Sequence, residues 1–140
     1  LDDTDFRNWK NLYEYREKDC AFCNLEGKAK SQNMFAFAID DKYPVTKNHK
    51  LIIPKRHVRS FFELGNAEYK GVLELLKKEK EELGRKDATI SAFNVGINDG
   101  KDSGQTIIHC HIHLIPRRKD DVSDPTGGVR GVFPEKRKYP

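Results

Sequence analysis

Several common features are missing from this chain of 140 residues, and each absence excludes a class of protein. No run of about 18 apolar residues occurs, so the sequence predicts no membrane-spanning helix and no membrane partner. Only three cysteines are present, too few for a disulfide framework, which favours a reducing, cytoplasmic setting. No secretory leader is recognisable, although the sequence begins with Leu1 rather than methionine. These absences favour a soluble cytoplasmic protein.

The chain also lacks a large excess of charge of one sign. Lysine and arginine number 26 against 22 aspartates and glutamates, so the net charge is +4. A dedicated nucleic-acid-binding domain carries a larger basic surface, so no nucleic-acid partner is predicted. Much of the excess lies near the C-terminus, in Arg117, Arg118, Lys119, Arg130, Lys136, Arg137 and Lys138. A solvated tail and a surface that attracts a small anionic ligand are the two interpretations of this stretch.

Patterns of apolar residues indicate one α+β domain with a single core and a largely antiparallel sheet. Apolar and aromatic runs predict four strands, over 34–40, 50–54, 89–95 and 107–115. A long helix is predicted from Asn66 as N-cap to Gly84, with residues 77–82 on its solvated face. Its predicted buried stripe consists of Tyr69, Val72, Leu73, Leu76 and Leu83. An amphipathic N-terminal helix is predicted over 5–18.

The most informative segment is 109–113, where three of the five histidines alternate with apolar residues. Residues i, i+2 and i+4 of a β-strand line one face, so the three imidazoles are predicted to project together. The intervening residues would face the core: Ile108, Cys110, Ile112 and Leu114. An imidazole with one nitrogen bonded to a carbonyl offers the other as a directed nucleophile. In one interpretation, His111 would attack phosphorus, and His113 would stabilise the phosphoryl oxygens or protonate the leaving group.

The loop that precedes the histidines combines glycines with short polar side chains. Its residues are Asn98, Gly100, Ser103, Gly104, Gln105 and Thr106. Glycines allow backbone N–H groups to approach an anion closely, so the loop is a candidate phosphate-binding segment. A competing interpretation is that the alternating histidines bind a metal ion themselves, as in some zinc enzymes. The strand offers no acidic partner for such a hydrolase, and both interpretations stay open at this point.

A second motif is Cys20-Ala21-Phe22-Cys23. Two thiolates separated by two residues can bind one zinc ion, which gives half of a tetrahedral site. His57 and His109 are candidates for the other half. A redox pair and two unconnected cysteines are the alternatives. Cys110 belongs to the histidine segment and is predicted to be a small core residue.

Taken in order, these motifs resemble the histidine triad (HIT) superfamily of nucleotide hydrolases and transferases. His109 to Ile115 matches its pattern His-φ-His-φ-His-φ-φ, where φ is apolar, and the similarity includes 40–57 and 104–108. The resemblance implies a HIT domain over 20–117, an N-terminal helical extension over 1–19 and a C-terminal tail over 118–140. It also implies a HIT-like α+β fold with a largely antiparallel five-stranded sheet, one long helix and an N-terminal helix. Homodimers with a sheet continued across the two-fold axis are common in this superfamily.

The resemblance further implies roles for individual residues. In the catalytic cluster of His49, His109, His111 and His113, the nucleophile would be His111, His113 would contact the α-phosphate, and His49 would support them. Further nucleotide contacts would come from Asp41 on the ribose, from Asn98, Gln105 and Thr106 near phosphate, and from Phe22, Leu25 and Ile39 around the base. The zinc ligands would be Cys20, Cys23, His57 and His109. Asn48 replaces a glycine often found before the upstream histidine, and asparagine tolerates positive φ.

The resulting functional prediction is a nucleotidyl hydrolase with structural zinc and no organic cofactor. It would act on dinucleoside polyphosphates or nucleoside phosphoramidates, form a covalent nucleotidyl-histidine and release a nucleoside monophosphate. One alternative keeps the covalent intermediate but transfers the nucleotide to phosphate or another acceptor instead of water. The other is a nucleotide-binding interaction protein with little turnover.

Overall fold

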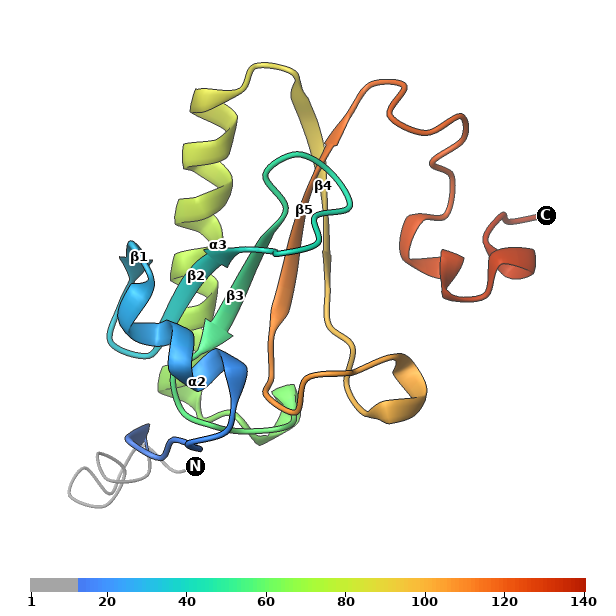
Figure 1. Cartoon of the computed structure of the whole chain (residues 1–140). Helices are drawn as coiled ribbons and strands as arrows, with labels where there is room; N and C mark the ends of the chain where they lie inside the picture. The colour runs from blue at the N-terminus through green and yellow to red at the C-terminus, as the bar shows by residue number, and fades with distance from the viewer. Residues whose placement is uncertain (1–12) are drawn as a thin grey trace.

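A computed structural model describes residues 13–140, which form a five-stranded antiparallel sheet with one long helix on a face of it (Figure 1). The strand order is β1-β2-β3-β5-β4. The strands are β1 (Ser31–Gln32), β2 (Ala36–Asp40), β3 (Lys50–Pro54), β4 (Ile90–Gly96) and β5 (Ile112–Arg118). The α-helices are α2 (Ala21–Leu25) and α3 (Asn66–Lys86). The predicted α+β fold class is confirmed.

The two faces of the sheet carry different partners because side chains alternate along β2 and β3. Ala36, Ala38 and Ile52 pack towards α3, where they meet Val72 and Leu75. The opposite face presents Phe37, Leu51 and Ile53, which form a second cluster with Phe22 of α2. The long helix therefore closes one face, and the short α2 covers part of the other.

The long helix departs from its prediction in three respects. Leu73 is 50% exposed, and Leu75 is buried in its place. Glu79 lies in the segment predicted to be solvated, but it is only 5% exposed because it falls one turn after Leu75 on the buried stripe. The N-cap is Gly65 rather than Asn66, and the helix continues past Gly84 to Lys86.

The histidine strand begins later than the sequence pattern predicts. β5 starts at Ile112, and Ile108 is 47% exposed instead of facing the core. The backbone explains the difference, since the N–H of His109 bonds to the carbonyl of Ile107 at 2.9 Å. The N–H of Cys110 then donates to the carbonyl of Val58 at 2.7 Å. These bonds divert 107–111 from the ladder, whereas Cys110 is buried as predicted.

The structure describes the C-terminal end of the chain in full but only part of the N-terminal end. The predicted helix over 5–18 lies mostly outside the described residues, and the described chain leaves helical geometry after Tyr13. The C-terminal stretch contains two short 3-10 turns, Gly128–Val132 and Pro134–Lys136, and lies beside β4 (Figure 1). Within residues 13–140, no helix has the length and apolar character needed to cross a membrane. The division into 1–19, 20–117 and 118–140 stays a prediction.

Candidate functional site

His111 lies at the start of the segment that becomes β5, and its ring is held in one tautomer. Its Nδ1 lies 2.8 Å from the carbonyl oxygen of His109. A carbonyl can only accept, so Nδ1 carries a proton, and in the neutral form of the ring the lone pair lies on Nε2. Phe22 packs edge-on against the ring, with centroids 5.0 Å apart. The imidazole therefore has a fixed orientation and directs Nε2 away from the carbonyl, as a directed nucleophile requires.

His49 and His113 form a hydrogen-bonded pair, and a backbone contact to His49 determines where the protons of the pair lie. The N–H of Val45 donates to Nδ1 of His49 at 3.2 Å, so that nitrogen accepts. A neutral His49 then carries its proton on Nε2, which lies 2.9 Å from Nδ1 of His113. A neutral His113 is left with its proton on Nε2. The relay thus makes His113 a donor, which suits contact with a phosphoryl oxygen.

Asp41 lies beside this pair. Its Oδ2 is 3.4 Å from Nε2 of His49 and 3.9 Å from Nδ1 of His113. Burial lowers the pKa of both histidines below the ordinary value, and the negative charge of Asp41 opposes that shift. For His113, the neighbouring His111 and His49 lower the pKa further. Both rings are therefore neutral near pH 7.

The lowered pKa values give a prediction for stability. The unfolded chain takes up protons near pH 6.5 that buried His49 and His113 resist, so stability should fall as the pH drops from 7 to 5. We expect thermal melts to show a melting temperature several degrees lower at pH 5. His49→Gln should show a smaller decrease between the same two pH values. An equal decrease in melting temperature in both proteins would contradict the lowered pKa of His49 as a cause of the pH dependence.

The range from pH 5 to pH 7 separates the effect of histidine titration on stability from the effect of carboxylate titration. Hydrogen bonds and salt bridges hold the pKa of Asp87, Asp121 and Asp124 below the usual range. Such groups lose their stabilising contribution only as the pH falls through and below the unfolded value of about 3.9. Melts between pH 5 and 7 therefore report mainly on histidines.

A cavity of about 660 Å³ opens over His111 and His113. Apolar side chains from α2, β2, β3 and the segment before β5 line part of it: Phe22, Leu25, Ile39, Leu51 and Ile107. Polar groups line the remainder, including Asp41, Asn98 and Thr106. The apolar part has the chemistry to hold a flat ring, and the polar part has the chemistry to hold hydroxyls and an anion.

Gln105 is the predicted nucleotide contact that the structure does not bring to the cavity. Its side chain is buried, and its Oε1 accepts from the N–H of Gly100 at 2.8 Å. Its Nε2 donates to the carbonyls of Arg59 and Ile107. These bonds hold the 98–106 loop against the core, so Gln105 shapes the loop from within. His109 also lies outside the cavity lining and is fully buried.

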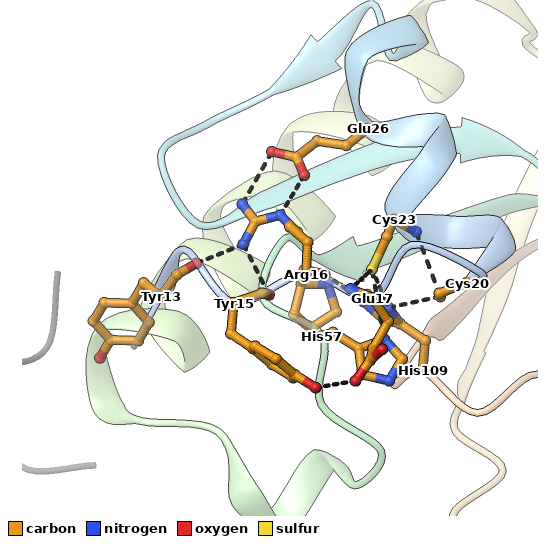
Figure 2. A network of polar contacts seen from close by, with 10 residues as sticks. Tyr13, Tyr15, Arg16, Glu17, Cys20, Cys23, Glu26, His57 and His109 are labelled. Atoms are coloured by element: carbon orange, nitrogen blue, oxygen red, sulfur yellow. Dashed lines mark hydrogen bonds and ion pairs between the residues drawn. The ribbon is translucent and has the colours of Figure 1, made fainter. Parts of the chain in front are cut away.

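A second cluster brings Cys20, Cys23, His57 and His109 together (Figure 2). Nδ1 of His109 lies 3.3 Å from Sγ of Cys20 and 3.6 Å from Sγ of Cys23. Nδ1 of His57 lies 3.5 Å from Sγ of Cys23. Tetrahedral zinc with ordinary bond lengths places sulfur and nitrogen ligands about 3.6 Å apart. The cluster therefore fits a four-coordinate zinc ion with little rearrangement.

The outer contacts of this cluster also suit a metal. Nε2 of His109 lies 2.7 Å from the carbonyl of Pro54, so it donates there and leaves Nδ1 as the ligand atom. Burial lowers the pKa of His109 to about 4, which keeps the ring neutral as a metal ligand requires. The backbone N–H of Glu17 points to Sγ of Cys23 at 3.5 Å. Such N–H···S contacts stabilise a thiolate.

A strap over 13–19 covers the cluster, and the sequence motifs gave no sign of it. Figure 2 shows Arg16 at its centre, paired with Glu26 and bonded to the carbonyls of Tyr13 and Tyr15. The carbonyl of Tyr15 also accepts from the N–H of His57 at 2.8 Å. The anchoring role of Arg16 could not be predicted from the sequence, because arginine is common on protein surfaces and no motif marks this one. Arg16 thus anchors the strap whose backbone contacts three of the cluster residues.

His109 connects the two clusters. Its side chain belongs to the Cys–His group, while its carbonyl oxygen fixes the tautomer of His111. A ligand held at Nδ1 of His109 therefore also holds the backbone that orients the candidate nucleophile.

Comparison with known proteins adds a family to this geometry. The model of the family described as HIT domain matches residues 27–120. The chain belongs to the HIT domain family. Among solved structures, a HIT family protein from Bacillus anthracis is 30% identical with a TM-score of 0.66, over 75% of this chain and 77% of that one. A Zn-bound histidine triad family protein from Mycobacterium smegmatis is 28% identical with a TM-score of 0.64, over 76% and 80%.

Two similar HIT proteins carry named activities. A bis(5'-nucleosyl)-tetraphosphatase (asymmetrical) of Schizosaccharomyces pombe is 38% identical over 81 residues, 58% of this chain and 44% of that protein. An adenosine 5'-monophosphoramidase of the same yeast is 29% identical over 107 residues, 73% of this chain and 77% of that protein. The chain thus spans less than half of the first relative. Membership of the family supports a nucleotide hydrolase at the level of class.

Proposed function

We propose that this HIT protein hydrolyses dinucleoside polyphosphates or nucleoside phosphoramidates at the α-phosphate. The observation that carries the proposal is the fixed tautomer of His111, whose Nδ1 is bound to the carbonyl of His109 and whose ring borders the cavity. The His49–His113 pair beside it supplies a donor for a phosphoryl oxygen or the leaving group. The two yeast relatives cover these two substrate classes.

The reaction has two balanced steps. Nε2 of His111 attacks the α-phosphorus, an N–P bond forms, and the bond from phosphorus to the leaving oxygen or nitrogen breaks. The N–H of neutral His113 donates to a phosphoryl oxygen and stabilises the charge that develops, and the leaving group takes any proton it needs from solvent. Water then attacks phosphorus and gives up a proton to solvent, the N–P bond breaks, the nucleoside monophosphate is released and neutral His111 is regenerated. This path explains why one neutral and directed imidazole is needed.

The remaining residues would hold the nucleotide. Phe22, Leu25 and Ile39 would enclose the base, because they form the apolar part of the cavity. Asp41 would accept hydrogen bonds from the ribose hydroxyls, and Asn98 and Thr106 would contact the phosphate. Gln105 would act indirectly by holding the loop that carries them.

We also propose that Cys20, Cys23, His57 and His109 hold a structural zinc ion. The ligand separations and the bond from His109 to Pro54 support this assignment. A zinc ion in this place would tie the segment around α2 to the sheet and fix the backbone at His109, but it would provide no Lewis acid at phosphorus. No organic cofactor is part of the proposal.

Product analysis tests the proposed reaction. The protein is incubated with diadenosine tetraphosphate and, separately, with adenosine phosphoramidate, and released AMP is quantified by chromatography. AMP from either substrate, with a protein species heavier by one adenylyl group in a rapid quench, is the expected result. Labelled phosphate incorporated into a nucleotide would instead indicate phosphorolysis. Nucleotide binding without AMP release would contradict the proposal and favour a binding protein.

Homodimerisation stays a prediction, and the edge of the sheet is compatible with it. β4 is an edge strand in the strand order, and Val95 on it is exposed. Pairing two copies through such an edge would satisfy its open backbone groups. We expect light scattering after size-exclusion chromatography to give twice the mass of the chain. A mass of one chain at micromolar concentration would contradict a stable dimer.

A further inference from the structure

One sector of the cavity is not used by the nucleotide half proposed above. The apolar slot would take the base, Asp41 the ribose and His111 the α-phosphate. The lining residues that remain include Lys42 and Tyr43, which follow β2 directly. The roles proposed above assign neither residue to the first nucleotide. Whatever is attached beyond the α-phosphate must leave the cavity past another part of its rim.

Tyr43 is an aromatic residue that does not pack into the hydrophobic core. Its side chain is 78% exposed although it lines the cavity. Nζ of Lys42 lies 5.7 Å from the centre of its ring. An exposed ring next to a cation has the chemistry to stack on a nucleobase while the cation meets phosphate.

The backbone of this segment is held in place, so the ring is presented on a fixed support. The N–H of Tyr43 donates to Oδ1 of Asp41 at 2.8 Å. The hydroxyl of Thr46 donates to the carbonyl of Pro116 at 2.8 Å. Asn48 closes the loop with φ of 70°, a left-handed conformation that asparagine tolerates. A fixed loop lowers the entropic cost of using Tyr43 as a binding surface.

The charges of the cavity point to the same ligand chemistry. Of the described residues that line it, Lys42 is the sole lysine or arginine, whereas Asp40 and Asp41 are acidic. Among the lining residues, Lys42 is therefore the one side chain that offers a lysine or arginine charge to a chain of several phosphates, and it lies directly next to Tyr43.

We propose that Lys42 and Tyr43 form a leaving-group subsite for a polyphosphate chain that ends in a second nucleobase. This inference rests on the proposed function, because it places the first nucleotide over His111. It favours dinucleoside polyphosphates over phosphoramidates with small leaving groups. Tyr43 stacks on the distal base, and Lys42 neutralises phosphates between the two nucleosides.

The test uses two ligands that differ only in the second nucleoside, namely diadenosine tetraphosphate and adenosine 5'-tetraphosphate. Affinities are measured by calorimetry in the His111→Ala background, so turnover is not required. Tyr43→Ala should weaken binding of diadenosine tetraphosphate by about tenfold, as expected for one lost stacking contact, and change the other affinity less than about twofold. Tyr43→Phe should retain the affinity. Lys42→Gln should weaken both ligands, because both carry the phosphates.

A matched control comes from an exposed aromatic residue away from the cavity. Phe62 is 78% exposed, as Tyr43 is, but does not line the cavity, so Phe62→Ala should leave both affinities unchanged. Equal weakening of the two ligands by Tyr43→Ala, or no weakening of either, would overturn the subsite. These outcomes concern binding alone, whereas failure of the proposed hydrolysis would appear as absent AMP release by the protein with His111 intact.

Discussion

Replacement of His111 by alanine is expected to lower AMP release from diadenosine tetraphosphate by at least about a thousandfold. The substitution removes the nitrogen that would form the covalent bond to phosphorus, and no nearby group offers the same geometry. His113 cannot take over, since its Nδ1 accepts from His49 and its other nitrogen carries the proton. Steady-state assays with product chromatography measure the decrease.

A second variant separates chemistry from folding. His111→Asn can still donate to the carbonyl of His109 but lacks the second ring nitrogen, so it should lose activity to the same extent. Both variants should keep the circular dichroism spectrum of the unsubstituted protein and bind nucleotide. AMP release within tenfold of the original rate in either variant would remove His111 as the nucleophile.

Loss of the proposed zinc ion is expected to affect stability far more than chemistry. Cys23→Ser, or a strong chelator, should release zinc and lower the melting temperature by roughly 10 °C, because several kcal/mol of metal binding no longer support the fold. At a temperature where the sheet remains folded, kcat should change only a few fold. Zinc content is measured by atomic absorption, and stability by thermal melts.

Cys110 supplies the control for this experiment. It is a fully buried cysteine outside the Cys–His cluster, and burial raises its pKa to about 12. Cys110→Ala should therefore lower stability through packing alone and leave zinc content unchanged. If chelation abolished AMP release while the fold stayed intact, the metal would have a role at phosphorus and the structural assignment would be wrong.

The sequence predicted best what depends on local pattern. The strand over 50–54 has the predicted bounds, because its apolar run ends at Pro54. The left-handed φ at Asn48 also agrees with the expectation from residue type. The cysteine pair and its two candidate histidines do lie together, although the folded sheet, and not their spacing, brings them into contact.

What depends on distant partners could not be predicted in this way. The displaced start of β5 follows from a bond between Cys110 and Val58, which no periodicity encodes. Gln105 looked suitable for phosphate, but backbone groups of the loop and of Arg59 occupy its amide. The strap around Arg16 likewise depends on Glu26, ten residues along the chain.

The tail agrees with its composition in exposure but not in every backbone detail. Its charge and polarity indicated a solvated stretch or a surface that attracts an anion, and no residue of 118–140 is buried, although the stretch also forms two short turns. Gly127 has φ of 86°, and a Cβ there would lie 1.9 Å from the carbonyl oxygen of Arg137. Only glycine permits that approach between residues ten positions apart, a requirement that appears only once the turn is formed.

The Cys–His cluster also has a consequence for folding kinetics. Its four proposed ligands come from segments 34 and 89 positions apart, so the complete set does not exist until β3 and the start of β5 have reached the N-terminal segment. Closing loops of that length lowers the entropy of the chain, and metal binding can offset this loss only after most of the sheet is formed. Zinc should thus bind after the rate-limiting step and act mainly by slowing unfolding. The lifetime of the folded state, rather than the rate at which it is reached, would then depend on zinc.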